Sequence, residues 1–317
     1  MSWWNDRAAR AGAVALALLT GVAAAAPTLA PYSARAQDRS AFLRPPALPG
    51  ADCSFRWLVR DSAGRLHLFG FSGCQVYLLG TDGVGRDVLS RLLLGARWSV
   101  ATALVGVLLA VGFGTVVGAT AGFRGGALDR ILMRGTEVFM ALPALYLVLA
   151  FRGLFPDALE PAQAFFMLVV SLAAVGWCGV ARIVRAQVLA LRERDFVASA
   201  AAAGAGDPRL LFRHILPNAL PFIWLQAGLT LPYFVMVEAA LSFLGLGLPE
   251  PEPSWGNMLA GVAASYSAMT TYWWTLLAPA GALTLAVLAS NLWIEGVRRT
   301  YFPTSGPASK QRRQRAS

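Results

Sequence analysis

Few side chains in this 317-residue sequence have the chemistry of a catalytic or metal-binding site. The two histidines are His67 and His214, and the only lysine is Lys310. A phosphate-binding loop of the form Gly-x-x-x-x-Gly-Lys-Ser/Thr is therefore absent, so the chain does not bind ATP in that manner. The topology derived below places the two histidines on opposite sides of a membrane, which excludes a shared histidine metal site or a histidine-based dyad. We therefore expect no metal site, no catalytic residue and no cofactor in this chain.

Glu238 is the one carboxylate well inside a strongly apolar segment. A charge within a bilayer is costly unless it faces a watery cavity or a partner, so Glu238 is a candidate for a translocation path. The alternative is a structural role, in which the carboxyl group only hydrogen-bonds to a neighbouring helix end. The same segment contains Pro217, Pro221 and Pro232, so its helix is expected to be kinked or to begin late.

The composition indicates the elements that must position these groups. The chain is 56% hydrophobic and 14% charged, with a mean hydropathy of +0.55, more apolar material than one soluble core can bury. A transmembrane helix needs roughly 20 apolar residues. The sequence therefore predicts an all-α integral membrane protein. Six transmembrane helices are expected: 11–34, 98–123, 131–151, 161–181, 218–246 and 266–294. The first also resembles a cleavable secretory signal, although its length favours a retained anchor.

Arginines predict the orientation of these helices. The loop 182–217 carries six arginines, and the tail after the last helix carries six basic residues. The positive-inside rule places both segments in the cytoplasm, which puts the N- and C-termini there as well. The tail 303–317 is expected to be disordered. Its basic cluster either contacts anionic lipid or merely satisfies the positive-inside rule.

The segment 35–97 is predicted to be external and to contain a β-hairpin. Two strand-like runs flank a turn-rich tetrad, with Arg60 predicted to lie opposite Arg65. Such a hairpin brings Cys53 and Cys74 near each other, and in an oxidising compartment they are candidates for a disulfide. The alternative is two unpaired, buried thiols.

Two further patterns concern the second predicted helix. The run 87–97 is typical of an interfacial helix and is expected to lie on the outer membrane surface, capped by Thr81 or Asp82. Small residues then recur every four positions and make a smooth face for close helix approach. They are Ala110, Gly114, Gly118 and Gly122. This face predicts either a seam against a partner subunit or packing within the chain.

The segment 192–217 predicts a helix, a sharp turn and a second helix. Residues 196–203 are nearly all alanine, an excellent helix former, and Gly204 and Gly206 end that helix. Asp207 is then predicted to cap the next helix, with a proline at its first position. Short helices across the membrane face suit insertion into a groove on another protein. The alternative is an amphipathic loop resting on the bilayer.

This segment resembles the loop of ABC importer permeases, whose motif reads E-A-A, three residues, Gly, nine residues, Ile-x-Leu-Pro. The matching positions are Ala198, Ser199, Ala200, Gly204, His214, Leu216 and Pro217. Ala198 stands where the family has glutamate, and His214 stands where it has isoleucine. Docking of a partner must therefore rest on shape, on the Gly204 turn and on the surrounding arginines.

Other motifs between residues 78 and 302 are similar to the second permease subunit of the dipeptide, oligopeptide and nickel permease group. They occupy residues 79–82, 85–91, 95–97, 141–143, 241–247 and 254–256. The resemblance implies six transmembrane helices of the ABC importer permease type, but it covers roughly residues 78–302 and does not extend to the hairpin region, which lies in the external segment after the first helix. Four regions follow: 1–34 with the first helix, 35–97 outside, 98–302 as permease core with the coupling loop 182–217, and the tail 303–317.

The resemblance also implies partners and a mechanism. The chain would pair with a homologous permease, in a heterodimer, and dock two cytoplasmic ATPases that hold ATP and Mg²⁺. An external solute-binding protein would deliver the cargo, a di- or oligopeptide, with nickel or another small solute as the alternative. A bacterial inner-membrane location with contacts to lipid, and none to nucleic acid, is expected. The implied coupling residues are Arg194, Asp195, Phe196, Ala198, Ala200, Gly204, Gly206, Asp207, His214, Leu216 and Pro217.

Overall fold

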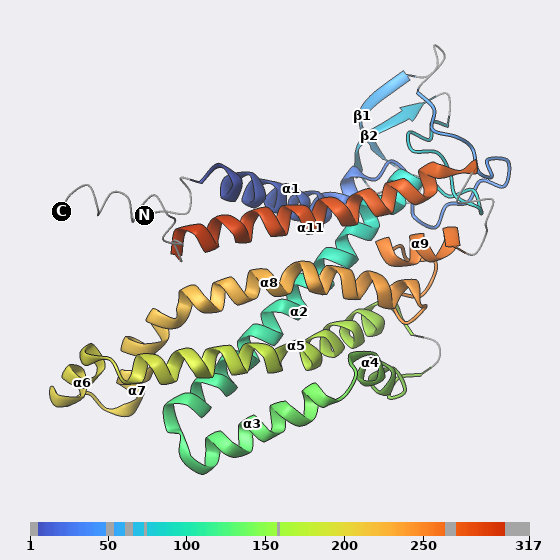
Figure 1. Ribbon diagram of the computed structural model, residues 1–317. Helices are drawn as coiled ribbons and strands as arrows, with labels where there is room; N and C mark the ends of the chain where they lie inside the picture. The colour runs from blue at the N-terminus through green and yellow to red at the C-terminus, as the bar shows by residue number, and fades with distance from the viewer. Residues whose placement is uncertain are drawn as a thin grey trace.

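Long helices run the length of the molecule and form its body, as the computed structural model shows (Figure 1). The structure describes residues 6–48, 54–60, 66–72, 75–156, 159–263 and 271–301. The longer helices are α1 (Arg7–Leu29), α2 (Val88–Arg124), α3 (Gly126–Ala141), α5 (Pro161–Arg192), α8 (Leu216–Phe243) and α11 (Trp273–Tyr301). The shorter ones are α4 (Ala144–Arg152), α6 (Asp195–Ala202), α7 (Asp207–Arg209), the π-helix η2 (Leu210–Ile215) and α9 (Trp255–Ala263).

Within the described residues, five helical segments are long and apolar enough to span a membrane, or six if a bent pair counts as one span. That pair is α3 and α4, which meet at 88°. The bend follows from Pro143, because a proline pushes the preceding residue out of the α region, and Leu142 is extended (φ −81°, ψ 128°). The all-α membrane fold is confirmed with five to six candidate spans, and the predicted third span corresponds to the broken pair of α3 and α4.

The expected interfacial helix 87–97 is wrong. These residues form the first turns of α2, which continues without a break for 37 residues, about 55 Å at 1.5 Å per residue. No proline interrupts α2, so nothing in its sequence forces the chain to turn along the membrane surface. The cap is Asp87, whose side chain accepts a hydrogen bond from the Ser90 N–H at 2.7 Å. Asp82 instead accepts from the Val84 and Arg86 N–H groups in the preceding turn.

The smooth face of α2 packs within the chain. A Cβ added to Gly118 would lie 2.3 Å from the Ala181 carbonyl oxygen, and one added to Gly114 would lie 2.6 Å from that of Trp177. Gly122 is equally close to α5, because an added Cβ would lie 2.8 Å from a carbonyl oxygen there. The seam between α2 and α5 therefore needs glycine, and the alternative of an intersubunit seam is wrong for these residues.

The predicted hairpin is present, with β1 (Ser54–Arg60) antiparallel to β2 (Leu66–Ser72). Arg60 pairs with Leu66, so the predicted register, with Arg60 opposite Arg65, is wrong by one residue. The predicted register would have opposed two like charges, which is unfavourable on a sheet. Cys53 and Cys74 lie outside the described residues, as does the tail 303–317, so the disulfide and the disordered tail stay predictions.

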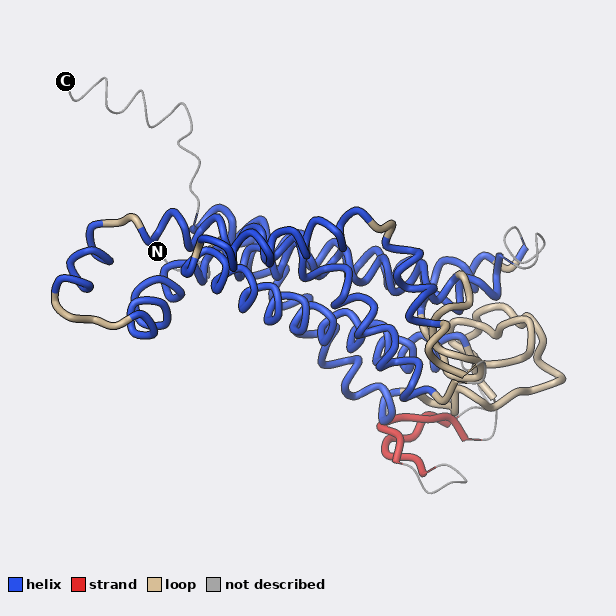
Figure 2. The backbone as a smooth tube through the Cα atoms, turned by 90° about the horizontal axis from the view of Figure 1, so that it is seen from below, coloured by secondary structure: helices blue, strands red, loops and turns tan. Residues whose placement is uncertain are grey.

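The molecule has two distinct ends (Figure 1, Figure 2). One, the coupling end, carries α6, α7 and η2, and the start of α1 and the end of α11 lie on the same side. The other, the outer end, carries the hairpin, α9 and the long connections 30–48, 75–87 and 244–254. The hairpin is tied to α1 there, since His67 Nδ1 lies 2.5 Å from the Ala30 carbonyl oxygen. His67 and His214 therefore lie at opposite ends, as predicted.

Candidate functional site

The predicted helix, turn and helix of the coupling loop are confirmed. α6 closes in a Schellman motif, in which the Gly204 N–H donates to Ala201 and the Ala205 N–H donates to Ala200. Gly204 has φ +85°, a left-handed conformation that a side chain makes costly. The predicted cap is wrong, because Gly206 occupies the N-cap position and Asp207 lies in the first turn. There its negative charge still interacts favourably with the positive end of the helix dipole.

An apolar anchor holds this turn to the long helices. The anchor consists of three buried side chains, Val197, Leu210 and Ile215, which pack with valines of α5. Full burial of an aliphatic side chain contributes about 1.5–3 kcal/mol per residue. The end of α5 is also tied to α2, because Arg192 Nη1 donates to the Phe123 carbonyl oxygen at 2.7 Å. The coupling loop is thus packed against the α2–α5 pair.

The opposite face of the coupling loop is exposed. Phe196 is 41% exposed on α6 and Phe212 is 68% exposed on η2. Most predicted coupling residues share this exposure: Arg194, Asp195, Phe196, Ala198, Gly204, Gly206, Asp207 and Pro217. The partly buried ones are Ala200, His214 and Leu216. This arrangement provides a protruding surface with two aromatic side chains and no bulky aliphatic cover around Gly204.

The π-helix η2 is the feature of this loop that the sequence analysis missed. Its widened turn is closed by a hydrogen bond from the Leu216 N–H to the Leu211 carbonyl, five residues earlier. Pro217 follows directly, and a proline ring clashes with the carbonyl four residues before it in an α-helix. A π-turn relieves that clash without ending the helix. Pro217 is the sequence feature that could have indicated the π-helix, because a proline at this position predicts that the helix is kinked or begins late.

Glu238 is fully enclosed by the chain. Its side chain has 0% exposure, and Oε1 accepts a hydrogen bond from Ser242 Oγ at 2.7 Å. Oε2 has no hydrogen-bond partner in the described part of the chain. Ser242 itself packs against α9, because a Cβ added to Gly256 would lie 2.6 Å from Ser242 Cβ. A translocation role for Glu238 stays a prediction, and it requires that the packing of α8 against α9 opens.

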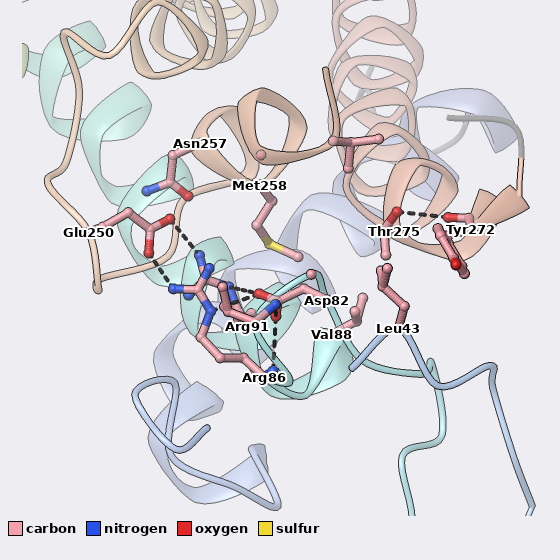
Figure 3. Close-up of a pocket in the computed structure, with 14 residues that line it drawn as sticks. Leu43, Asp82, Arg86, Val88, Arg91, Glu250, Asn257, Met258, Tyr272 and Thr275 are labelled. Carbon is pink, nitrogen blue, oxygen red and sulfur yellow. Dashed lines mark hydrogen bonds and ion pairs between the residues drawn. The ribbon is translucent and has the colours of Figure 1, made fainter. Parts of the chain in front are cut away.

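The sequence analysis also missed a charged cluster at the outer end (Figure 3). Arg86 Nε donates to Asp82 at 2.7 Å and pairs with Glu250 through Nη1. Arg91 is almost fully buried and binds Glu250 at 3.0 Å and the Pro251 carbonyl oxygen at 3.3 Å. The cluster joins the start of α2 to the connection after α8. Glu250 lies more than 150 positions from both arginines, so no local pattern signals those two pairings.

Further hydrogen bonds close the outer end around this cluster. The Trp255 backbone N–H donates to Ser99 Oγ at 3.2 Å, and its indole N–H donates to the Leu92 carbonyl at 3.1 Å. The Trp274 indole donates to the Thr81 carbonyl at 3.2 Å. Burial raises the pKa of Asp87 to about 6, opposed by the hydrogen bonds from Ser90. Polar contacts thus join the segments of the outer end, beside the apolar packing of Val88, Met258 and Trp274, whereas the coupling loop is anchored mainly by apolar contacts.

Comparison with known proteins agrees with this architecture. Residues 114–300 match the family described as "Binding-protein-dependent transport system inner membrane component". The chain is 37% identical to the oligopeptide transport system permease protein OppC of Bacillus subtilis (strain 168) over 224 residues, 71% of this chain and 70% of the relative. It is 34% identical to the di/tripeptide transport system permease protein DppC of Pseudomonas aeruginosa (strain UCBPP-PA14) over 302 residues, 95% of this chain and 90% of the relative.

A third relative is the dipeptide transport system permease protein DppC of Haemophilus influenzae (strain ATCC 51907 / DSM 11121 / KW20 / Rd), 33% identical over 299 residues. That alignment spans 94% of this chain and 91% of the relative. The two longer alignments leave too few residues unmatched to omit segment 35–97. These two alignments therefore span more of the chain than the family match over residues 114–300.

Proposed function

Since the chain belongs to the family of binding-protein-dependent transport system inner membrane components, we propose that it imports short peptides. It is a multi-pass permease subunit of an ABC importer and not an enzyme. The three relatives are named for oligopeptides, di/tripeptides and dipeptides, which supports a peptide cargo over nickel. ATPase and solute-binding protein partners follow from membership of such an importer.

The finer assembly is part of the same proposal. We infer a heterodimer with a homologous permease, two cytoplasmic ATPases that hold ATP and Mg²⁺, and an external binding protein. The chain itself carries no cofactor. The bacterial inner membrane surrounds it, with both termini in the cytoplasm. The arginines support this orientation, because those of the coupling loop lie at the same end as Arg298 and Arg299 of α11.

The coupling loop is the proposed ATPase contact, and the exposed Phe196 beside the Gly204 turn is the observation that carries it. An aromatic side chain on a short protruding helix fits a groove on a soluble partner. The family glutamate is absent at Ala198, so a carboxylate contributes nothing there. Shape and the exposed arginines Arg194, Arg209 and Arg213 take its place.

Transmission follows from the apolar anchor. Because Val197, Leu210 and Ile215 are buried against α5, a displacement of α6 moves α5 rather than bending the loop. α5 in turn is locked to α2 along the glycine seam. ATP-driven closure of the ATPases would therefore tilt these helices together between inward-facing and outward-facing states, as rigid bodies.

The test is the substitution Gly204→Val in the complete transporter. A β-branched residue at φ +85° strains the turn by about 1–3 kcal/mol and displaces α6. We expect ATP hydrolysis to continue while peptide uptake falls by roughly tenfold or more, corresponding to about 1.4 kcal/mol of lost coupling. Uptake and hydrolysis are measured together in proteoliposomes.

Gly245→Val is the matched control. Gly245 has φ +79° and, like Gly204, has no atom within 4 Å of an added Cβ, but it lies at the outer end. The backbone strain is therefore similar in both variants. If Gly245→Val uncouples as strongly as Gly204→Val, or if neither changes the ratio of uptake to hydrolysis, the coupling loop does not transmit the ATPase motion.

A further inference from the structure

A cavity of about 380 Å³ lies at the outer end between the start of α2, α9 and the start of α11 (Figure 3). Small-molecule sites typically occupy about 300–1,000 Å³, so its size suits a small ligand. The cavity is far from the coupling loop, which lies at the opposite end of the long helices. None of the coupling residues lines it. The proposed ATPase contact therefore does not account for it.

One wall of the cavity is charged with both signs. Arg86 and Arg91 supply guanidinium groups, and Asp82 and Glu250 supply carboxylates. The Arg91 side chain is only 3% exposed, whereas that of Glu250 is 50% exposed. A guanidinium has five N–H donors, so Arg86 retains donors beyond its bonds to Asp82 and Glu250. This wall offers donors for an anionic group and, beside them, an accessible carboxylate for a cationic one.

The facing wall is apolar. Figure 3 shows Met258 above the charged groups, and Val88 and Leu43 on the side of Asp82 away from Glu250. Val262 and Tyr272 extend this apolar lining. Met258 and Val262 are both buried, and the flexible thioether of a methionine adapts to side chains of different shape. Such a wall can accommodate apolar side chains of different shapes and does not select one particular residue type.

We propose that this cavity binds a short zwitterionic peptide, with its carboxylate at Arg86 and Arg91 and its amino group at Glu250. In the structure these charges neutralise one another, so a ligand with both signs can replace the arginine–Glu250 pairing on both sides, whereas a ligand with one sign would leave one partner unmatched. The apolar wall then receives a side chain of the peptide. This inference rests on the proposed peptide transport and assigns the permease an entry site of its own, at the end where cargo arrives.

The same chemistry occurs in the headgroup of phosphatidylethanolamine, which also joins an anion to an amine. The proposal commits to the peptide, and the lipid is tested as a competitor. Binding is measured to the intact permease and ATPase complex in phosphatidylcholine nanodiscs, without the binding protein. The probe is tritiated alanylphenylalanine. Replacing part of the phosphatidylcholine by phosphatidylethanolamine should leave peptide affinity unchanged, and a loss of peptide binding in that membrane would assign the cavity to lipid.

Gly261→Leu fills the cavity without touching the charged cluster. Gly261 lines the cavity on α9 and has no atom within 4 Å of an added Cβ, so the larger residue introduces no clash. We expect the peptide Kd to rise by about tenfold or more. Gly281→Leu is the matched control on α11, where an added Cβ also meets nothing, and its Kd should stay within about twofold.

Modified probes test the charge assignment. N-acetylated and C-amidated alanylphenylalanine each lose one charge, and each should bind at least about tenfold more weakly than the free peptide. In a Glu250→Gln complex the penalty for N-acetylation should disappear, while the penalty for C-amidation remains. Equal binding of all three probes to the unsubstituted complex would overturn the proposal, as would equal Kd values for Gly261→Leu and Gly281→Leu.

Failure of this inference is distinguishable from failure of the proposed function. If the complete transporter with its binding protein takes up alanylphenylalanine but the complex alone does not bind it, the cavity is not a peptide site and the transport function stands. If uptake itself is absent across a panel of di- and oligopeptides, the proposed cargo is wrong.

Discussion

The two ends of this permease are held together by different physics. At the coupling end, buried valine, leucine and isoleucine side chains fix a protruding turn whose outer face is open. At the outer end, the buried Arg91 and the partly buried Arg86 pair with carboxylates, and indole N–H groups bind backbone carbonyls across the helices. Apolar contacts tolerate small sliding, whereas paired buried charges lose much of their stabilisation when they separate. The difference predicts that substitutions at the two ends have separate effects on stability and on coupling.

The glycine seam between α2 and α5 joins the two ends, so breaking it should have the largest effect. Gly118→Leu places a side chain against the Ala181 carbonyl, only 2.3 Å from the position of an added Cβ. The helices must separate, and we expect loss of folded permease, measured as yield and thermal unfolding of the purified complex. Gly112→Leu, where an added Cβ meets nothing, should fold normally. Normal folding of Gly118→Leu would contradict the rigid connection between the ends.

The second prediction concerns Asp87 at the outer end. Its carboxyl is buried and its pKa is raised to about 6, above the unfolded value of 3.8. A raised acid pKa means that folding favours the neutral form, so this contribution is fully present below pH 3.8 and is lost as the pH rises through 6. The loss amounts to about 3 kcal/mol at most, because one pKa unit corresponds to about 1.36 kcal/mol.

Asp87→Asn should therefore stabilise the protein above pH 6 and match the unsubstituted protein near pH 4, since asparagine still caps α2. The measurement is thermal unfolding from pH 4 to pH 8. Asp38 is a control of opposite sign at the same end, because hydrogen bonds from Ser40 lower its pKa. Its contribution is present at high pH and is lost on acidification. An Asp87→Asn protein that follows the same pH profile as the unsubstituted one would contradict the assignment.

The third prediction tests whether the outer end and the coupling end are stabilised independently of each other. Arg91→Met removes the hydrogen bonds to Glu250 and to the Pro251 carbonyl, with an expected cost of about 2 kcal/mol. Hydrogen exchange should increase in segment 244–256 and stay unchanged in 195–216. Arg35→Met is the control, since the Arg35 side chain is 64% exposed and surface pairs contribute about 0–1 kcal/mol. Increased exchange at both ends would show that the ends are not energetically distinct.

The same contrast explains what the sequence could predict. Local signals were sufficient for the long apolar helices, the hairpin and the Gly204 turn, because each depends on residues close in sequence. The continuous α2 was missed, since the arginines at its start are matched by Glu250, far along the chain. The coupling face was predicted from its motif, whereas its anchor through Leu210 and Ile215 depends on tertiary packing against α5. Contacts between residues that are distant in sequence produce no periodic pattern in the sequence from which they could be predicted.

The smallest effect is expected within α6, where neighbouring residues have opposite roles. Val197→Ala removes part of the buried anchor and costs about 2 kcal/mol locally, so hydrogen exchange of α6 should increase and coupling should weaken. Phe196→Ala removes a side chain that is 41% exposed, so exchange should stay unchanged while the affinity of the ATPase for the permease falls.

Exchange and ATPase binding are measured on both variants of the reconstituted complex. Identical changes in the two variants would mean that α6 does not divide into an anchoring face and a docking face. A division into two faces, by contrast, lets the loop bind its partner firmly and still move as one piece with α5.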